Sequence, residues 1–153
     1  MACRLEEEPM PRLLLTLIAG IAAFTLLPSP CPVFAQTEAP VLEKWYPALF
    51  AADAETLGSL LSNDAEIRLE DLGITQTKAE FLESLGAWKD SIEGAAFAWK
   101  LAAGAPASAT EATALVCYRF PSNELLTREV FTFAAGKITE SVQTTEGESC
   151  AGF

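Results

Sequence analysis

The architecture follows from the stretch Trp45 to Asp71, which reads WYPALFAADAETLGSLLSNDAEIRLED. Apolar residues recur at helical spacing on both sides of Ala52-Asp53, so we expect two helices that meet there. Asp53 suits the N-cap of the second helix, because its carboxylate can accept a hydrogen bond from a free amide of the first turn. Pro47 indicates that the first helix begins near this residue or kinks at it.

A strand and a third helix are predicted next. Asn63-Asp64 is typical of a turn, and Ala65 to Glu70 then alternates apolar and polar residues as a half-buried strand does. Gly73 indicates a loop after that strand. Thr77 and Glu80 match a capping box, which begins a helix. The apolar residues of this helix recur at helical spacing and share one face: Phe81, Leu85, Trp88 and Ile92.

The C-terminal part of the chain predicts a meander of strands joined by turns. The segments that alternate apolar and polar residues are Ala95 to Ala102, Glu111 to Phe120, Leu125 to Phe133 and Lys137 to Thr145. Strands joined by short turns pair in antiparallel fashion. The predicted fold class is therefore α+β, with a cone-shaped, curved antiparallel sheet wrapped around the N-terminal helices.

Residues 1–35 have the form of a secretory signal peptide. Leu13 to Leu27 is apolar and uncharged, but at about fifteen residues it is short for a membrane span. Val33-Phe34-Ala35 offers small residues for cleavage before Gln36. We therefore expect a protein that is exported, periplasmic or secreted, without a stable membrane span after processing. An uncleaved membrane anchor is the alternative, and the start could be Met10 instead of Met1.

The predicted organisation is a signal peptide at 1–35, a folded domain at 36–146 and a C-terminal tail at 147–153. Cys117 and Cys150 are the cysteines that remain after processing. An even number of cysteines in an exported chain is compatible with a disulfide between them, because the tail is long enough to fold back across a neighbouring strand. The alternative is a buried, free Cys117 beside a frayed tail.

The composition excludes several classes of partner and chemistry. The formal net charge is −11, with 21 acidic and 10 basic residues, which argues against nucleic acid and anionic membrane surfaces as partners. The chain has no histidine, which excludes Ser-His-Asp and Cys-His catalysis and most zinc sites. We expect no cofactor and no metal.

Three segments resemble the nuclear transport factor 2-like superfamily, and its SnoaL-like and ketosteroid isomerase-like branch in particular. They are Ala52-Asp53 at the helix junction, Leu57 to Ala65 (LGSLLSNDA), and Glu129 to Ile138 (EVFTFAAGKI). The resemblance covers about Val41 to Thr145. It implies a curved sheet wrapped around a helix pair, with a pocket at the open end.

The resemblance also bears on activity. Ketosteroid isomerases keep an aspartate base and a Tyr/Asp oxyanion hole in this pocket. The matching positions fall on Trp45, Leu69 and Leu126, which are all apolar in this chain. The resemblance therefore implies that the isomerase machinery is absent, and we expect a mostly apolar cavity without a paired base and acid.

The preferred hypothesis is an exported SnoaL-like domain that is not catalytic and binds a small apolar ligand or serves as an interaction module in the periplasm. Tyr46, Tyr118 and Arg128 are the candidate ligand-binding residues. Core packing is the alternative for Tyr118, and a cross-strand ion pair is the alternative for Arg128. A second hypothesis is an isomerase, cyclase or dehydratase with relocated acid-base residues, such as Glu70 with either tyrosine. A third is a homodimer that acts as a scaffold through the outer sheet face.

Overall fold

The computed structural model describes residues 39–104, 107–108 and 110–153. The predicted signal peptide and its cleavage site lie outside the described residues. The elements in chain order are α1 (Ala39–Ala51), α2 (Ala54–Leu60), β1 (Leu61–Leu69), the 3₁₀ helix η1 (Glu70–Leu72), β2 (Ile74–Thr77), α3 (Lys78–Ser91), β3 (Ala96–Leu101), β4 (Glu111–Arg119), β5 (Glu124–Ala134) and β6 (Lys137–Gly147).

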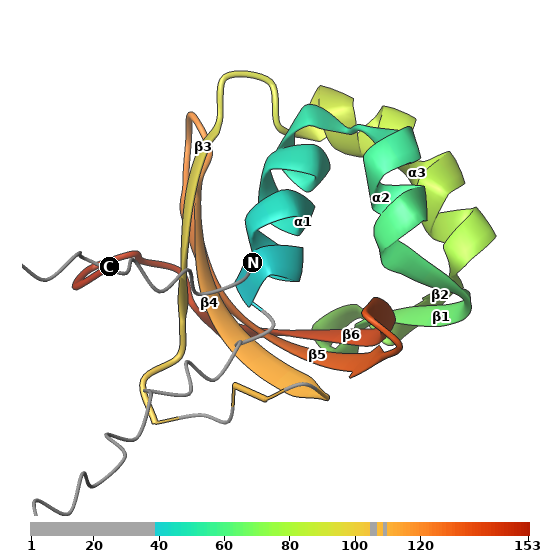
Figure 1. Cartoon of the computed structure of the whole chain (residues 1–153). Helices are drawn as coiled ribbons and strands as arrows, with labels where there is room; N and C mark the ends of the chain where they lie inside the picture. The colour runs from blue at the N-terminus through green and yellow to red at the C-terminus, as the bar shows by residue number, and fades with distance from the viewer. Residues whose placement is uncertain (1–38, 105–106, 109) are drawn as a thin grey trace, which may run out of the picture. The chain divides into compact units, whose positions relative to one another are not determined.

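The six strands form one curved sheet in the order β2-β1-β6-β5-β4-β3, and the helices lie on its concave side (Figure 1). The predicted α+β class with a sheet wrapped around helices is confirmed. The sheet is mixed, however, because β1 runs parallel to β6 while the other neighbours are antiparallel. A hairpin forces two strands to be antiparallel, but no turn joins β1 to β6, so the expectation of a wholly antiparallel sheet was wrong.

The helix junction forms as the sequence predicts. The carboxylate of Asp53 accepts a hydrogen bond from the amide of Thr56 at 3.1 Å, which caps α2. Helix α1 begins at Ala39 and continues through Pro47, so it does not start near the proline. Burial of Trp45 and Tyr46 on this helix stabilises it and offsets the backbone hydrogen bond that proline cannot donate.

One local prediction for the next segment was wrong. Asn63-Asp64 lies within β1, at a shift in the register of β1 against β6, and is not a turn between elements. The chain does leave the strand before Gly73, through η1 and a left-handed turn at this glycine, but the sequence did not predict β2, which then pairs with β1 as a short edge strand. The capping box is confirmed, since the carboxylate of Glu80 accepts a hydrogen bond from the amide of Thr77 at 2.8 Å.

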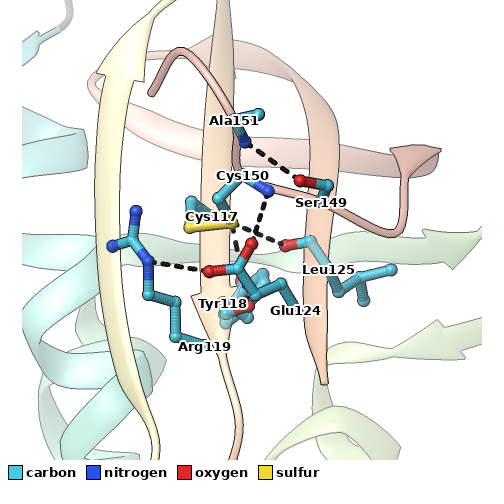
Figure 2. Close-up of a disulfide and its surroundings, with 8 residues drawn as sticks. All are labelled: Cys117, Tyr118, Arg119, Glu124, Leu125, Ser149, Cys150 and Ala151. Atoms are coloured by element: carbon cyan, nitrogen blue, oxygen red, sulfur yellow. Dashed lines mark hydrogen bonds and ion pairs between the residues drawn. A yellow bond between two sulfur atoms is a disulfide. The ribbon is translucent and has the colours of Figure 1, made fainter.

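The C-terminal tail folds back over the outer face of the sheet. Cys117 of β4 and Cys150 of the tail are joined by a disulfide, with their Cα atoms 5.7 Å apart (Figure 2). Glu124 also holds the tail against the sheet. One of its carboxylate oxygens accepts a hydrogen bond from the amide of Cys150 at 2.8 Å, and the other forms an ion pair with Arg119 at 3.2 Å. Cys117 is fully buried as a result, although it lies on the face of β4 that points away from the helices.

Candidate functional site

A buried glutamate lies on the concave face of the sheet. Every second side chain along β5 points toward the helices. These inward-facing residues are all buried, and they are Thr127, Glu129, Phe131 and Phe133. Glu129 is only 3 % exposed. A buried carboxylate is costly unless it is hydrogen-bonded or neutral, so this position needs an explanation beyond packing.

Three hydroxyl groups bind the Glu129 carboxylate. Tyr46 of α1 donates to Oε2 at 3.0 Å, and Tyr118 of β4 donates to Oε1 at 3.1 Å. Thr127, the next inward residue of β5, donates to Oε1 at 3.3 Å. The ring of Tyr46 is fixed by Trp99, whose ring centroid lies 4.8 Å away. Helix α1 and strands β4 and β5 thus converge on one carboxylate.

Burial controls the protonation of this cluster. It raises the pKa of Glu129 from 4.5 to about 7, and the hydrogen bonds from the two tyrosines and Thr127 oppose that rise. Burial, followed by the nearby charge of Glu129, raises the pKa of Tyr46 and of Tyr118 well above 10. The tyrosines therefore stay protonated as hydrogen-bond donors, while Glu129 can gain or lose a proton near neutral pH.

The carboxylate opens onto a cavity of about 270 Å³ between α1, α3 and the concave face of the sheet. Its apolar lining residues are Trp45, Leu49, Ile67, Leu69, Leu72, Phe81, Leu85 and Trp88. Its polar lining residues are Gln76, Ser84, Tyr118, Glu129, Ser141 and Gln143. No lysine or arginine is among these lining residues. This combination of an apolar wall and few polar groups is typical of a site for a small neutral molecule.

The predicted ligand-binding residues separate into two groups. Tyr118 lines the cavity, and Tyr46 contacts Glu129 without being one of the lining residues. Arg128 points the opposite way from Glu129, to the outer face of the sheet, where it pairs with Glu146 at 2.5 Å. The alternative of a cross-strand ion pair therefore describes Arg128, with Glu146 as its partner. Glu70, the carboxylate suggested for a relocated active site, is exposed in η1.

The cavity wall is mostly apolar, as expected. The expectation that it lacks a carboxylate paired with a proton donor was wrong, because the Glu129 carboxylate lies 3.1 Å from the Tyr118 hydroxyl in that cavity. The apolar positions matched to the isomerases were Trp45, Leu69 and Leu126, and the first two do line the cavity. Leu126 shares the outer face with Arg128. Glu129 and Phe131 are two residues apart, so they share one face of β5, and this spacing was the sequence signal that Glu129 could point inward. The signal was ambiguous because Leu126 and Val130 make the other face of β5 equally apolar.

The described part of the chain contains no cluster of Asp, Glu or Cys side chains that could hold a metal ion. No helix in that part is long and apolar enough to cross a membrane.

Comparison with known proteins gives a structural likeness without a sequence match. No protein-family model and no curated protein sequence matches the chain. A ketosteroid isomerase candidate from Kribbella flavida is similar in structure, with a TM-score of 0.61, 14% identity, and coverage of 73% of this chain and 79% of the other. An NTF2-like protein of unknown function from Mesorhizobium loti has a TM-score of 0.61, 14% identity and coverage of 74% and 93%.

The enzyme-like neighbours include IdmH, described as a polyketide cyclase candidate from Streptomyces antibioticus. It aligns with a TM-score of 0.54, 14% identity and coverage of 71% of this chain and 91% of the other. At this identity the likeness shows the fold alone. The described domain has the nuclear transport factor 2-like fold, as the resemblance in the sequence indicated.

Proposed function

We propose that this protein is an acid-base enzyme that moves a proton on a small, neutral and largely apolar carbonyl compound, as isomerases, cyclases and dehydratases do. The observation that carries the proposal is Glu129, a carboxylate with a pKa of about 7 that lines an apolar cavity and is held by two tyrosines. A general base works best when its pKa lies near the working pH.

The geometry supports a simple, redox-neutral step. The ionised carboxylate of Glu129 takes a proton from the carbon next to the substrate carbonyl. The electrons of the broken C–H bond form the enolate, and the negative charge moves from Glu129 to the substrate oxygen. The carboxylic acid then returns the proton to another carbon, which gives an isomer. Alternatively, the enolate carbon attacks a second carbonyl of the same molecule, whose oxygen takes the negative charge and then the proton of Glu129, which gives a cyclic product.

The tyrosines support this step without exchanging protons themselves. Both stay protonated, so each can donate a hydrogen bond to the ionised form of Glu129 and keep the carboxylate in place. Tyr46 reaches Oε2 from α1 and Tyr118 reaches Oε1 from β4, so the two oxygens are held from opposite elements. Oε2 accepts only one of the described hydrogen bonds, which leaves it the better placed oxygen to receive a proton.

The test is proton exchange on a probe ketone. β-Tetralone is a neutral bicyclic ketone with acidic hydrogens beside its carbonyl, and its exchange with heavy water is followed by proton NMR. We expect the wild-type protein to accelerate exchange over buffer, and Glu129→Gln to lose about 100-fold or more of that acceleration. Glu111→Gln, an exposed glutamate on β4, is the matched control and should retain it.

Two results would overturn the proposed function. One is wild-type protein that gives no acceleration over buffer, which would leave a binding protein as the better description. The other is a Glu129→Gln variant that exchanges protons as fast as the wild type, which would place the base elsewhere.

We also propose that the protein is exported and works in the periplasm or outside the cell. The form of residues 1–35 and the disulfide between Cys117 and Cys150 support this location, because disulfides persist in oxidising compartments. N-terminal sequencing of the protein from its natural source tests it. We expect a mature chain that begins at Gln36, and a chain that still begins at Met1 or Met10 would contradict cleavage.

A further inference from the structure

Gln143 and Ser141 on β6 lie beside the proposed base. Gln143 is directly opposite Glu129 in the β5–β6 register, and Ser141 is directly opposite Phe131, the next inward residue of β5. Side chains opposite one another on the same face of an antiparallel pair have Cβ atoms about 5 Å apart. Both Gln143 and Ser141 line the same cavity as Glu129. Gln143 and Ser141 are thus the polar side chains of β6 that lie beside the Glu129 carboxylate on the inner face of the sheet.

The donors of Gln143 and Ser141, like the amide of Gln76 on β2, have no acceptor among the described residues, whereas two other polar groups of the cavity have one. The hydroxyl of Ser84 donates to the carbonyl of Phe81, and the hydroxyl of Tyr118 donates to Glu129. Among the described residues, no side-chain hydrogen bond involves Gln143 or Ser141, although Ser141 is buried. The indole N–H of Trp45, on the cavity wall, is also buried without an acceptor in that part of the chain. The cavity therefore presents donors that an acceptor on a ligand would satisfy.

We infer that the amide of Gln143, assisted by the hydroxyl of Ser141, donates hydrogen bonds to the carbonyl oxygen of the substrate while Glu129 takes a proton from the adjacent carbon. The inference rests on the proposed function and extends it to the electrophilic half of the site. Neutral amide and hydroxyl donors stabilise the charge that develops on such an oxygen, and loss of one donor costs roughly 100-fold or more in rate.

This arrangement also selects the substrate. The cavity offers hydrogen-bond donors and no cationic side chain among its lining residues, so it favours a neutral acceptor such as a ketone or an enone over a carboxylate or a phosphate. The base and the donors lie on neighbouring strands, which suits a carbonyl oxygen and a hydrogen on the adjacent carbon of one small molecule. An apolar molecule without an oxygen would leave the donors unpaired.

The experiment compares two probes that share a carbon skeleton. β-Tetralone carries the carbonyl and tetralin lacks it, so the ratio of their dissociation constants isolates the contribution of the oxygen. We expect wild-type protein to bind β-tetralone about five- to tenfold more tightly than tetralin. Gln143→Leu should reduce that preference several-fold and leave the affinity for tetralin nearly unchanged. Thr144→Val, which removes a hydroxyl from the outer face of β6 beside Gln143, is the control and should keep the preference.

A second variant guards against misfolding. Gln143→Met has nearly the same shape as glutamine and no donor, and it should lose the preference as Gln143→Leu does. Ser141→Ala should weaken the preference less. A merely structural role for Gln143 would change the affinities for both probes together, so the ratio distinguishes the two cases. Wild-type protein that binds β-tetralone no better than tetralin, or variants at Gln143 that retain the full preference, would overturn the inference.

Failure of the inference can be told apart from failure of the proposed function. Proton exchange that depends on Glu129, combined with an unchanged carbonyl preference in both Gln143 variants, would reject the role of Gln143 and leave the base in place. A carbonyl preference that disappears in the Gln143 variants, without any exchange by the wild type, would support the binding role and reject the enzyme.

Discussion

The hydroxyl of Tyr118 lies 3.1 Å from a carboxylate oxygen of Glu129, and both side chains line the same apolar cavity. Tyr118 faces inward from β4 and Glu129 from β5. Their side chains meet across an offset in register, because Tyr118 pairs with Leu125 and Glu129 pairs with Ala114. A carboxylate that meets a tyrosine hydroxyl in an apolar cavity has the geometry for general acid-base chemistry. This contact is the observation that supports the proposed enzyme over a passive binder.

Removal of the Tyr118 hydroxyl should raise the pKa of Glu129. The hydrogen bond from Tyr118 favours the ionised carboxylate and thus lowers its pKa, so Tyr118→Phe leaves the effect of burial less opposed. A hydrogen bond to a charged group is worth about 1.5 kcal/mol or more, which corresponds to a rise of about one pH unit. NMR titration of protein with ¹³C-labelled glutamate carboxyls measures it. A pKa that stays the same or falls in Tyr118→Phe would contradict the contact.

The buried carboxylate should make the fold less stable as the pH rises toward neutrality. The folded chain holds the proton of Glu129 up to about pH 7, whereas the unfolded chain releases it near 4.5. The proton on Glu129 therefore stabilises the folded state. This contribution to the free energy of unfolding is fully present below about pH 4.5 and is lost as the pH rises through about 7, and it amounts to about 3 kcal/mol. Urea unfolding across this range measures it. Glu129→Gln should remove most of this fall in the free energy of unfolding, and the exposed-site control Glu111→Gln should keep it. A wild-type protein whose free energy of unfolding does not fall over this pH range would refute the burial argument.

The disulfide should stabilise the domain without tuning the acid-base site. Cys117 and Cys150 are 33 residues apart in sequence, and closing such a loop contributes about 3 to 4 kcal/mol in the chain-entropy model. Cys150→Ser should lower the free energy of unfolding by a comparable amount. Its proton-exchange profile should keep the wild-type midpoint, because Cys117 and Tyr118 point to opposite faces of β4. A Cys150→Ser variant as stable as the wild type would show that the bond does not constrain the chain.

Arg128 should be dispensable for ligand binding. Its side chain is 40% exposed on the outer face of the sheet and pairs with Glu146, so it does not reach the cavity. Exposed ion pairs contribute about 1 kcal/mol or less to stability. Arg128→Ala should therefore bind β-tetralone with wild-type affinity and unfold at nearly the same urea concentration. A loss of β-tetralone affinity of tenfold or more would show that the outer face takes part in the site.

Local patterns predicted the elements well where their chemistry was self-contained. Asp53 caps α2, and Thr77 with Glu80 caps α3, because these contacts involve residues three apart and need no tertiary context. Pairings between distant segments were less accessible. The parallel contact of β1 with β6 follows from how the chain crosses the sheet, and no local residue signal encodes that direction.

The candidate site was predictable in part. Tyr46 and Tyr118 were identified as polar groups near a cavity, but the carboxylate they bind was not. Alternation along β5 gives two faces that both carry apolar residues, so the sequence alone could not decide whether Arg128 or Glu129 points inward. The pairing of Glu129 with Ala114 on β4 and with Gln143 on β6 joins distant segments, and it is this tertiary pairing that identifies the inner face.

The most direct test of the central claim, that Glu129 is the base, is the pH profile of β-tetralone exchange catalysed by the wild-type protein. The rate above buffer should rise about tenfold per pH unit below the Glu129 pKa of about 7 and level off above it, because only the ionised carboxylate accepts a proton. Glu129→Gln should show no such rise. A wild-type rate that does not change between about pH 5 and pH 9, or a profile that survives in Glu129→Gln, would contradict the claim.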